Sequence, residues 1–125
     1  MVKSLTAILI SIALLIGAAI FEWRFVDKQF ESFEEELETL YEKTENETAS
    51  AADAKSVQTS WETRKEKLHV WIPHNDISRI DEYMAETVRL VGRKEYDLAL
   101  AKLEILLHLT ECLPNTYSPA IENIL

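Results

Sequence analysis

Residues 5–21, LTAILISIALLIGAAIF, are predominantly apolar, and none of them is charged. At about 1.5 Å per residue, a helix of this length covers roughly 25 Å, close to the lower limit for crossing a hydrocarbon core of about 30 Å. Lys3, Trp23 and Arg24 flank the run and are residue types that extend such a span into the headgroups. The pattern predicts a transmembrane anchor over residues 1–21, with Lys3, Trp23 and Arg24 at the membrane interface.

The charges beside this anchor favour one orientation. Lys3 and the amino terminus lie on the short side, whereas the long side begins with a mixture of acidic and basic residues. This bias predicts a single-pass cell-membrane protein with its N-terminus in the cytoplasm and residues 22–125 outside. The alternative is a cleaved signal peptide with small residues at 17–19. Because the apolar run continues to Phe21 and Trp23, an uncleaved signal-anchor is favoured, and both interpretations place residues 22–125 outside.

Beyond the anchor the apolar positions become periodic. They recur at steps of four, three, four and three, as in the seam of a coiled coil, at Val26, Phe30, Phe33, Leu37 and Leu40. Glutamates and other polar residues occupy the other positions, so the remaining faces of this helix are expected to be solvated. The first helix is predicted to run unbroken over residues 5–43.

Three more helices are expected after a polar stretch at residues 46–54, in which Thr48 or Ser50 is the predicted N-cap. The second helix should end just before Pro73, the third at a left-handed Gly92, and the fourth at Pro114. Asn75 or Asp76 is the expected cap of the third helix. The apolar positions of these helices are Val57, Trp61, Leu68 and Trp71, then Ile77, Ile80, Met84, Val88 and Val91, then Tyr96, Ala99, Leu100, Leu103, Leu106, Leu107 and Leu113.

We therefore predict an all-α protein in which an N-terminal transmembrane helix continues into a small antiparallel bundle of about four helices, spanning residues 22–125. Trp61 is expected to pack against Phe33 and Leu37. Basic residues of the second helix should lie near carboxylates of the first, with Arg64, Lys65 and Lys67 facing Glu31, Glu34 and Glu35. The apolar tail residues Ile121, Ile124 and Leu125 are expected to dock on the bundle, with a groove of a partner as the alternative.

Charge and candidate chemistry narrow the function further. The chain has 13 basic side chains, of which only Lys3 precedes residue 22, and 22 acidic ones, so residues 22–125 carry a formal charge of −10. That sign argues against nucleic acid as a partner. His108, Glu111 and Cys112 share one helical face, but a single such triplet is weak evidence for a metal site or a metal-dependent hydrolase. We expect no catalytic residue, no cofactor and no metal, and hence no enzyme.

The assembled features resemble a family of small bacterial single-pass membrane proteins with a helical domain of unknown function. The resemblance rests on Lys3-Ser4-Leu5, Trp61, the corner Ile72-Pro73-His74-Asn75-Asp76-Ile77, His108-Leu109, and the terminal Asn123-Ile124-Leu125. It implies membrane anchoring and a helical fold. It brings no activity, substrate or cofactor, but makes another membrane protein a plausible partner.

Two functions follow as hypotheses. The first is a membrane-anchored, non-catalytic interaction or assembly module that binds another membrane protein or itself. Self-association is expected through the stripe over residues 26–40, and the interaction or packing residues are Phe30, Phe33, Leu37, Leu40, Trp61, Trp71 and His74. The alternative is an extracytoplasmic ligand-sensing domain that works through a membrane partner, with a pocket lined by Trp61, Trp71, His74 and Tyr83.

Overall fold

The computed structural model describes residues 2–117 of the chain, with side chains as far as Leu113. Four helices follow one another: α1 over Val2–Glu45, α2 over Ala51–Leu68, α3 over His74–Gly92 and α4 over Tyr96–Tyr117. The described residues contain no strand, so the predicted all-α class is confirmed. The tail residues Ile121, Ile124 and Leu125, for which docking was predicted, lie outside the described residues.

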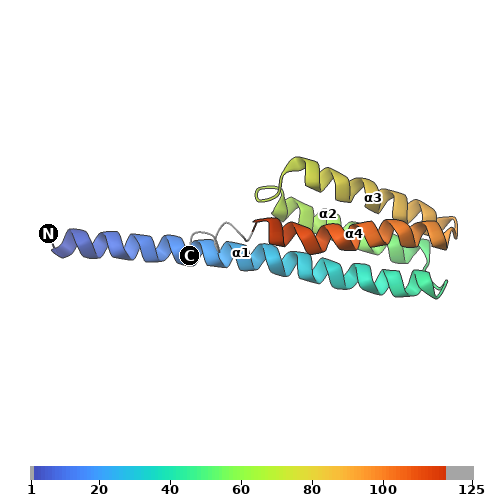
Figure 1. The fold of residues 1–125 in the computed structure, drawn as a ribbon, viewed down its shortest axis with the longest axis horizontal. Coiled ribbons are helices and arrows are strands. Elements are labelled where there is room, and N and C mark those ends of the chain that lie inside the picture. The colour runs from blue at the N-terminus through green and yellow to red at the C-terminus, as the bar shows by residue number, and fades with distance from the viewer. Residues whose placement is uncertain (1, 118–125) are drawn as a thin grey trace.

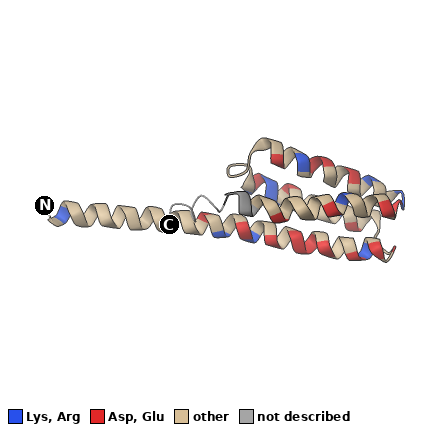
Figure 2. Cartoon of the chain, in the orientation of Figure 1, with Lys and Arg blue, Asp and Glu red and all other residues tan. Residues whose placement is uncertain are grey.

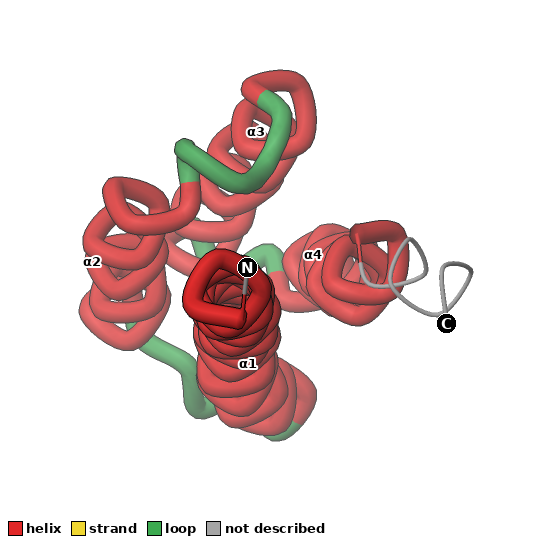
Figure 3. The backbone as a smooth tube through the Cα atoms, turned by 90° about the vertical axis from the view of Figure 1, so that its left-hand side faces the viewer, coloured by secondary structure: helices red, strands yellow, loops and turns green. Residues whose placement is uncertain are grey.

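Each helix runs antiparallel to the one before it, and the second half of α1 packs with the other three helices (Figure 1). Seen along its long axis, the molecule has α1, α2, α3 and α4 arranged around a common centre (Figure 3). Contacts join α1 with α2, α2 with α3, α3 with α4, and α4 with α1. The short turns enforce this antiparallel order, and the predicted four-helix bundle is confirmed.

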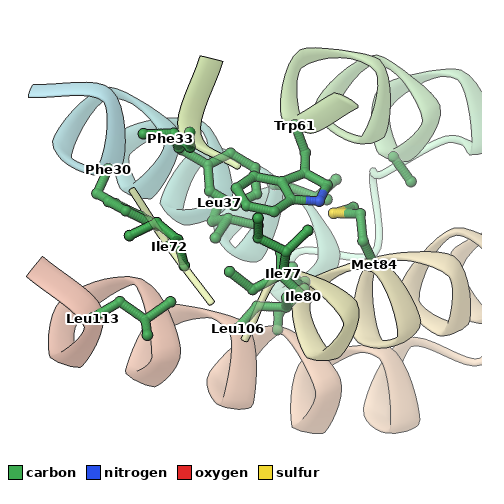
Figure 4. Close-up of a cluster of buried hydrophobic side chains, with 14 of the residues drawn as sticks. Phe30, Phe33, Leu37, Trp61, Ile72, Ile77, Ile80, Met84, Leu106 and Leu113 are labelled. Carbon is green, nitrogen blue, oxygen red and sulfur yellow. The ribbon is translucent and has the colours of Figure 1, made fainter. Parts of the chain in front are cut away.

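The stripe of α1 forms one wall of the core. All five of its members are buried: Val26, Phe30, Phe33, Leu37 and Leu40. Trp61 from α2 and Met84 from α3 complete the same cluster, together with leucines of α4 such as Leu106 (Figure 4). Because the stripe is consumed by packing within the chain, the expectation of self-association through residues 26–40 is wrong: it leaves no apolar surface for a second copy.

A reciprocal cap starts α2. The Ser50 hydroxyl accepts a hydrogen bond from the Asp53 N–H at 3.1 Å, and the Asp53 carboxylate accepts one from the Ser50 N–H at 3.0 Å. This is a capping box, with an aspartate in the position that glutamate commonly fills. The prediction of an N-cap at Ser50 is confirmed.

The link between α2 and α3 differs from the prediction. α2 ends at Leu68, four residues earlier than expected, and the Leu68 carbonyl accepts hydrogen bonds from the N–H groups of Trp71 and Ile72. The residue before a proline avoids the helical region, so the chain unwinds ahead of Pro73 and Ile72 turns into the core. Trp71 therefore lies in a turn rather than on a helix.

The caps of α3 and the end of α4 also differ from the predictions. α3 begins at His74 with Pro73 as its N-cap and without a side-chain cap, so neither Asn75 nor Asp76 has the expected capping role. Helix α4 continues past Pro114, because proline removes one intrahelical hydrogen bond while its fixed φ remains compatible with a helix.

The two turns at the far end of the bundle end α1 and α3 in the same way. After α1, the N–H groups of Glu47 and Thr48 bond to the carbonyls of Thr44 and Lys43; after α3, those of Lys94 and Glu95 bond to Val91 and Leu90. Both are Schellman motifs, and their left-handed residues are Glu47, with φ of 58°, and Lys94, with φ of 60°. The expectation that Gly92 is left-handed is wrong: Gly92 is the last helical residue of α3.

Candidate functional site

The first half of α1 extends beyond the bundle as a single helix (Figure 1). Its residues are exposed from Val2 to Arg24, and the large apolar ones remain uncovered, with Leu14 at 69% and Phe21 at 72% exposure. A helix that is apolar on every face is stable only where something other than water surrounds it. Among the described helices, α1 alone is long and apolar enough to cross a membrane, judged by length and composition.

The three residues predicted for a membrane interface lie at the two ends of this stretch. Lys3 is in the first turn of α1, and Trp23 and Arg24 follow the last apolar residue. Trp23 follows Lys3 by twenty positions, which corresponds to about 30 Å of helix, the thickness of a typical hydrocarbon core. The spacing therefore fits a span with a polar or amphipathic residue at each boundary.

The bundle begins close to the end of the apolar stretch. Val26 is the first buried residue of α1, five residues after Phe21, which corresponds to about 8 Å along the helix axis. The connection between the two parts is continuous helix, without a glycine, a proline or a loop. The apolar stretch and the core stripe of the bundle are therefore two parts of one helix.

The predicted interaction or packing residues fall into two groups. Phe30, Phe33, Leu37, Leu40 and Trp61 are core residues. By contrast, Trp71 is 42% exposed, and His74 is exposed with its ring 3.4 Å from the Ser78 hydroxyl.

The pocket required by the ligand-sensing hypothesis is not assembled by the residues named for it. Trp61 is in a filled part of the core, in contact with Phe33 (Figure 4). Tyr83 is half-buried on α3, where the ammonium group of Lys102 lies 5.6 Å from its ring centre. Trp71 and His74 are on the surface, so the four side chains do not enclose a common cavity.

Polar contacts between α1 and α2 converge on Arg64. Its guanidinium donates to the Gln29 side chain and to the Ser32 hydroxyl, both at 2.8 Å, and lies 3.5 Å from the Glu36 carboxylate. The predicted partners Glu31, Glu34 and Glu35 are not the ones used. Gln29, Ser32 and Glu36 share the face of α1 that turns toward α2, and periodicity alone did not reveal that rotation.

A second polar contact joins α2 to α3 through Asp81, a residue that the sequence pattern did not single out. The Trp61 indole N–H donates to its carboxylate at 2.7 Å, and the Lys65 ammonium lies 3.4 Å from it. A buried indole normally needs such an acceptor, which is the signal that could have identified a partner on a neighbouring helix.

Acidic residues are frequent along the bundle half of α1 (Figure 2), and one of them, Glu34, lies near Glu111 of α4. Partial burial raises the pKa of Glu34 above its ordinary value, with further contributions from the negative charges of Glu38, Glu111 and Glu31. Nearby, the Tyr41 hydroxyl donates to Glu104 at 3.1 Å, and this bond raises the pKa of Tyr41. At this contact the neighbouring carboxylates disfavour ionised Glu34, whereas the Tyr41–Glu104 hydrogen bond joins α1 to α4.

The histidines make local contacts. His108 lies with its ring 3.6 Å from the Cys112 sulfur, both exposed, and the His69 ring contacts the Glu66 carbonyl at 2.6 Å. Over residues 2–117, no group of three or more His, Cys, Asp or Glu side chains is arranged to hold a metal ion. The face formed by His108, Glu111 and Cys112 thus offers no assembled metal centre.

The profile of one protein family matches residues 20–124, which is most of the chain, so the chain belongs to that family. The family is described as a Domain of unknown function (DUF4363). The match begins where the apolar stretch ends and covers the bundle. No curated protein and no solved structure shows significant similarity to the chain.

Proposed function

We propose that this member of the family is a single-pass protein of the bacterial cell membrane whose helical bundle is a non-catalytic interaction and assembly module. The observation that supports this proposal best is the continuity of α1. One helix of 44 residues combines an uncovered apolar half with a half that supplies the core stripe of the bundle. A lipid bilayer would bury the first half, just as the other helices bury the second.

The orientation belongs to the same proposal. The positive charge of Lys3 beside the apolar stretch supports a cytoplasmic position for that end of α1 and a position outside for the bundle. The apolar stretch then acts as an uncleaved signal-anchor. The bundle is strongly acidic, which supports a protein partner rather than nucleic acid or close contact of its whole surface with anionic lipid.

The partner is another membrane protein or a second copy of this chain. The core stripe of α1 is buried, so assembly would use the outer surfaces of the bundle or the apolar stretch itself. Several described features have structural roles rather than catalytic ones: Asp81 and Arg64 join helices, and His69 and His74 make local contacts.

Crosslinking in intact membranes tests the proposal. The full chain, tagged at its C-terminus, is expected to fractionate with membranes, to keep residues 1–21 when its mass is measured, and to capture a defined membrane protein or itself. Impermeant thiol labelling in a Cys112→Ser chain then tests orientation: Leu98→Cys should react in intact cells, and Ser4→Cys only after lysis. A soluble chain or the loss of residues 1–21 would contradict the anchor, and inverse labelling would contradict the orientation.

A further inference from the structure

The turn between α2 and α3, residues 69–73, exposes two large apolar side chains next to each other. Val70 is 69% and Trp71 42% exposed, whereas the neighbouring Ile72 is 3% exposed. Ile72 points toward Phe30 in the core (Figure 4). With one residue held in the core and two N–H groups bonded to the Leu68 carbonyl, the backbone of the turn is well defined. The burial of Ile72 and these hydrogen bonds therefore hold Val70 and Trp71 at the surface.

This turn lies at the end of the bundle from which the apolar half of α1 emerges (Figure 1). Buried contacts begin at Val26, about 8 Å along α1 from Phe21. The headgroup layer on each side of a hydrocarbon core is about 5 to 8 Å thick. If residues 5–21 span the bilayer, this end of the bundle adjoins the headgroups, and side chains that project from it can reach them.

The charge of the turn differs from that of the chain around it. Residues 67–75, KLHVWIPHN, contain one lysine, two histidines and no carboxylate, although the whole chain has 22 acidic side chains. An acidic residue here would be repelled by anionic headgroups, and its absence removes that cost. Tryptophan is the side chain most characteristic of the membrane interface, because its ring is apolar and its N–H remains able to hydrogen-bond.

From these three observations we propose that the turn 69–73 is a second membrane contact, in which Trp71 and Val70 enter the interfacial layer of the leaflet from which α1 emerges. The inference rests on the proposed membrane anchoring and identifies which side of the bundle faces the lipid. Two contacts, α1 and the turn, fix the tilt of the bundle and its rotation about α1. The outward surfaces of α3 and α4 then have a defined height above the membrane.

Lipid is the expected partner of Val70 and Trp71 because the turn is part of the end of the bundle that adjoins the bilayer. The exposed apolar residue Leu98 provides the matched comparison. It is 56% exposed in the first turn of α4, at the opposite end of the bundle. If exposure of an apolar residue alone were sufficient for lipid contact, Leu98 and Val70 would behave alike.

The test uses the full chain with Cys112→Ser and one introduced cysteine, at Val70, Leu98 or Leu14, labelled with a polarity-sensitive fluorophore. Each protein is reconstituted in vesicles of phosphatidylcholine with a minority of phosphatidylglycerol, with or without a lipid whose acyl chain carries a nitroxide quencher near the headgroup. We expect quenching at Val70 to be several-fold stronger than at Leu98, with a blue-shifted emission. Trp71→Asp in the Val70→Cys chain should reduce that quenching, while the far-UV circular dichroism and the unfolding midpoint of the bundle stay unchanged.

The label at Leu14 separates the two proposals. If Leu14 is in the bilayer but Val70 remains in water, the membrane contact of the turn is wrong and the anchor stands. If Leu14 is also in water, the anchor itself is wrong. Equal quenching at Val70 and Leu98 would overturn the specific role of the turn. A second result would also overturn it: the Val70 label stays in water in lipid vesicles but is protected in native membranes. In that case a protein, and not lipid, would cover the turn.

Discussion

The indole ring of Trp61 lies on the ring of Phe33, with 5.1 Å between the ring centroids and 30° between the planes. Both side chains are almost fully buried, and they join α2 to the stripe of α1. The same indole donates its N–H to Asp81 on α3 at 2.7 Å. One side chain therefore connects three helices through two kinds of contact, and the first prediction concerns it.

Trp61→Ala should destabilise the bundle by about 3–5 kcal/mol, because it removes a large core side chain and leaves a cavity. Trp61→Phe should lose clearly less, since it keeps a ring against Phe33 but forfeits the bond to Asp81. Asp81→Asn keeps an acceptor for the indole and is expected to cost less than about 1 kcal/mol. Urea unfolding of the full chain in non-ionic micelles, followed by far-UV circular dichroism, measures all three. Equal losses for the alanine and phenylalanine variants would refute this assignment.

Glu47→Gly and Lys94→Gly should each stabilise the bundle by about 1 kcal/mol. Both positions have a left-handed backbone, which glycine adopts without the steric cost that a Cβ atom incurs. Arg93→Gly is the matched control: its φ is −89°, so glycine should bring no gain there. Thermal unfolding of the three variants gives the comparison, and a gain at Arg93 equal to that at Lys94 would count against the Schellman assignment.

Gly92→Ala should also stabilise the protein, by about 0.5–1 kcal/mol. Gly92 is helical, and an added Cβ would meet only the Ala51 Cβ at 3.8 Å, an ordinary contact. Had Gly92 been the left-handed residue that the sequence pattern suggested, alanine would destabilise instead. The sign of the change in the unfolding midpoint decides between the two backbones.

Protonation of Asp53 in acid should lower the stability of the bundle. The hydrogen bonds from the Ser50 backbone and side chain lower the pKa of Asp53 below its ordinary value of 3.8, with a smaller contribution from Lys43. A lowered pKa stabilises the folded state above pH 3.8, and this contribution is lost as the pH falls through the folded-state pKa. Asp53→Ala should remove that part of the pH dependence, while Ser50→Ala should cost about 1 kcal/mol at neutral pH. An unchanged acid limb in the Asp53 variant would contradict the capping box.

Protonation of Glu34 should have the opposite effect and raise the stability of the bundle. Its pKa is raised by partial burial and by neighbouring carboxylates, so its ionised form opposes folding. Stability from this group is gained as the pH falls through the raised pKa, and is complete below the ordinary value of 4.5. At pH above the raised pKa, Glu34→Gln should increase the unfolding midpoint and added salt should reduce the difference. Glu35→Gln, on an exposed position of the same helix, is the control; an equal effect there would indicate a general charge effect.

Much of the architecture followed from the spacing of apolar residues. The steps from Val26 to Leu40 predicted the buried face of α1 residue by residue, and Ser50 was one of two predicted caps. The apolar run over residues 5–21 was equally evident from the sequence. These features were predictable because helix period, capping and uninterrupted apolarity are set by residues close together in the chain.

The pairing of side chains between helices was not predictable in the same way. Arg64 reaches Gln29, Ser32 and Glu36 instead of Glu31, Glu34 and Glu35, and Lys65 turns to Asp81 on α3. Each choice depends on the rotation of one helix against its neighbour. Glu34 and Glu36 are only two residues apart, yet Glu36 faces α2, where it pairs with Arg64, and Glu34 faces α4, where it lies near Glu111.

Local sequence patterns were sufficient for the number of helices, the inward face of α1 and the apolar character of its first half. Packing decided where α2 ends, which residue takes the left-handed conformation after α3, and that Trp61 is buried while Trp71 is exposed. The two tryptophans had looked alike on one apolar face. They differ because burying Ile72 ahead of Pro73 unwinds the chain after Leu68 and turns Trp71 outward, and that balance is set by contacts far apart in the sequence.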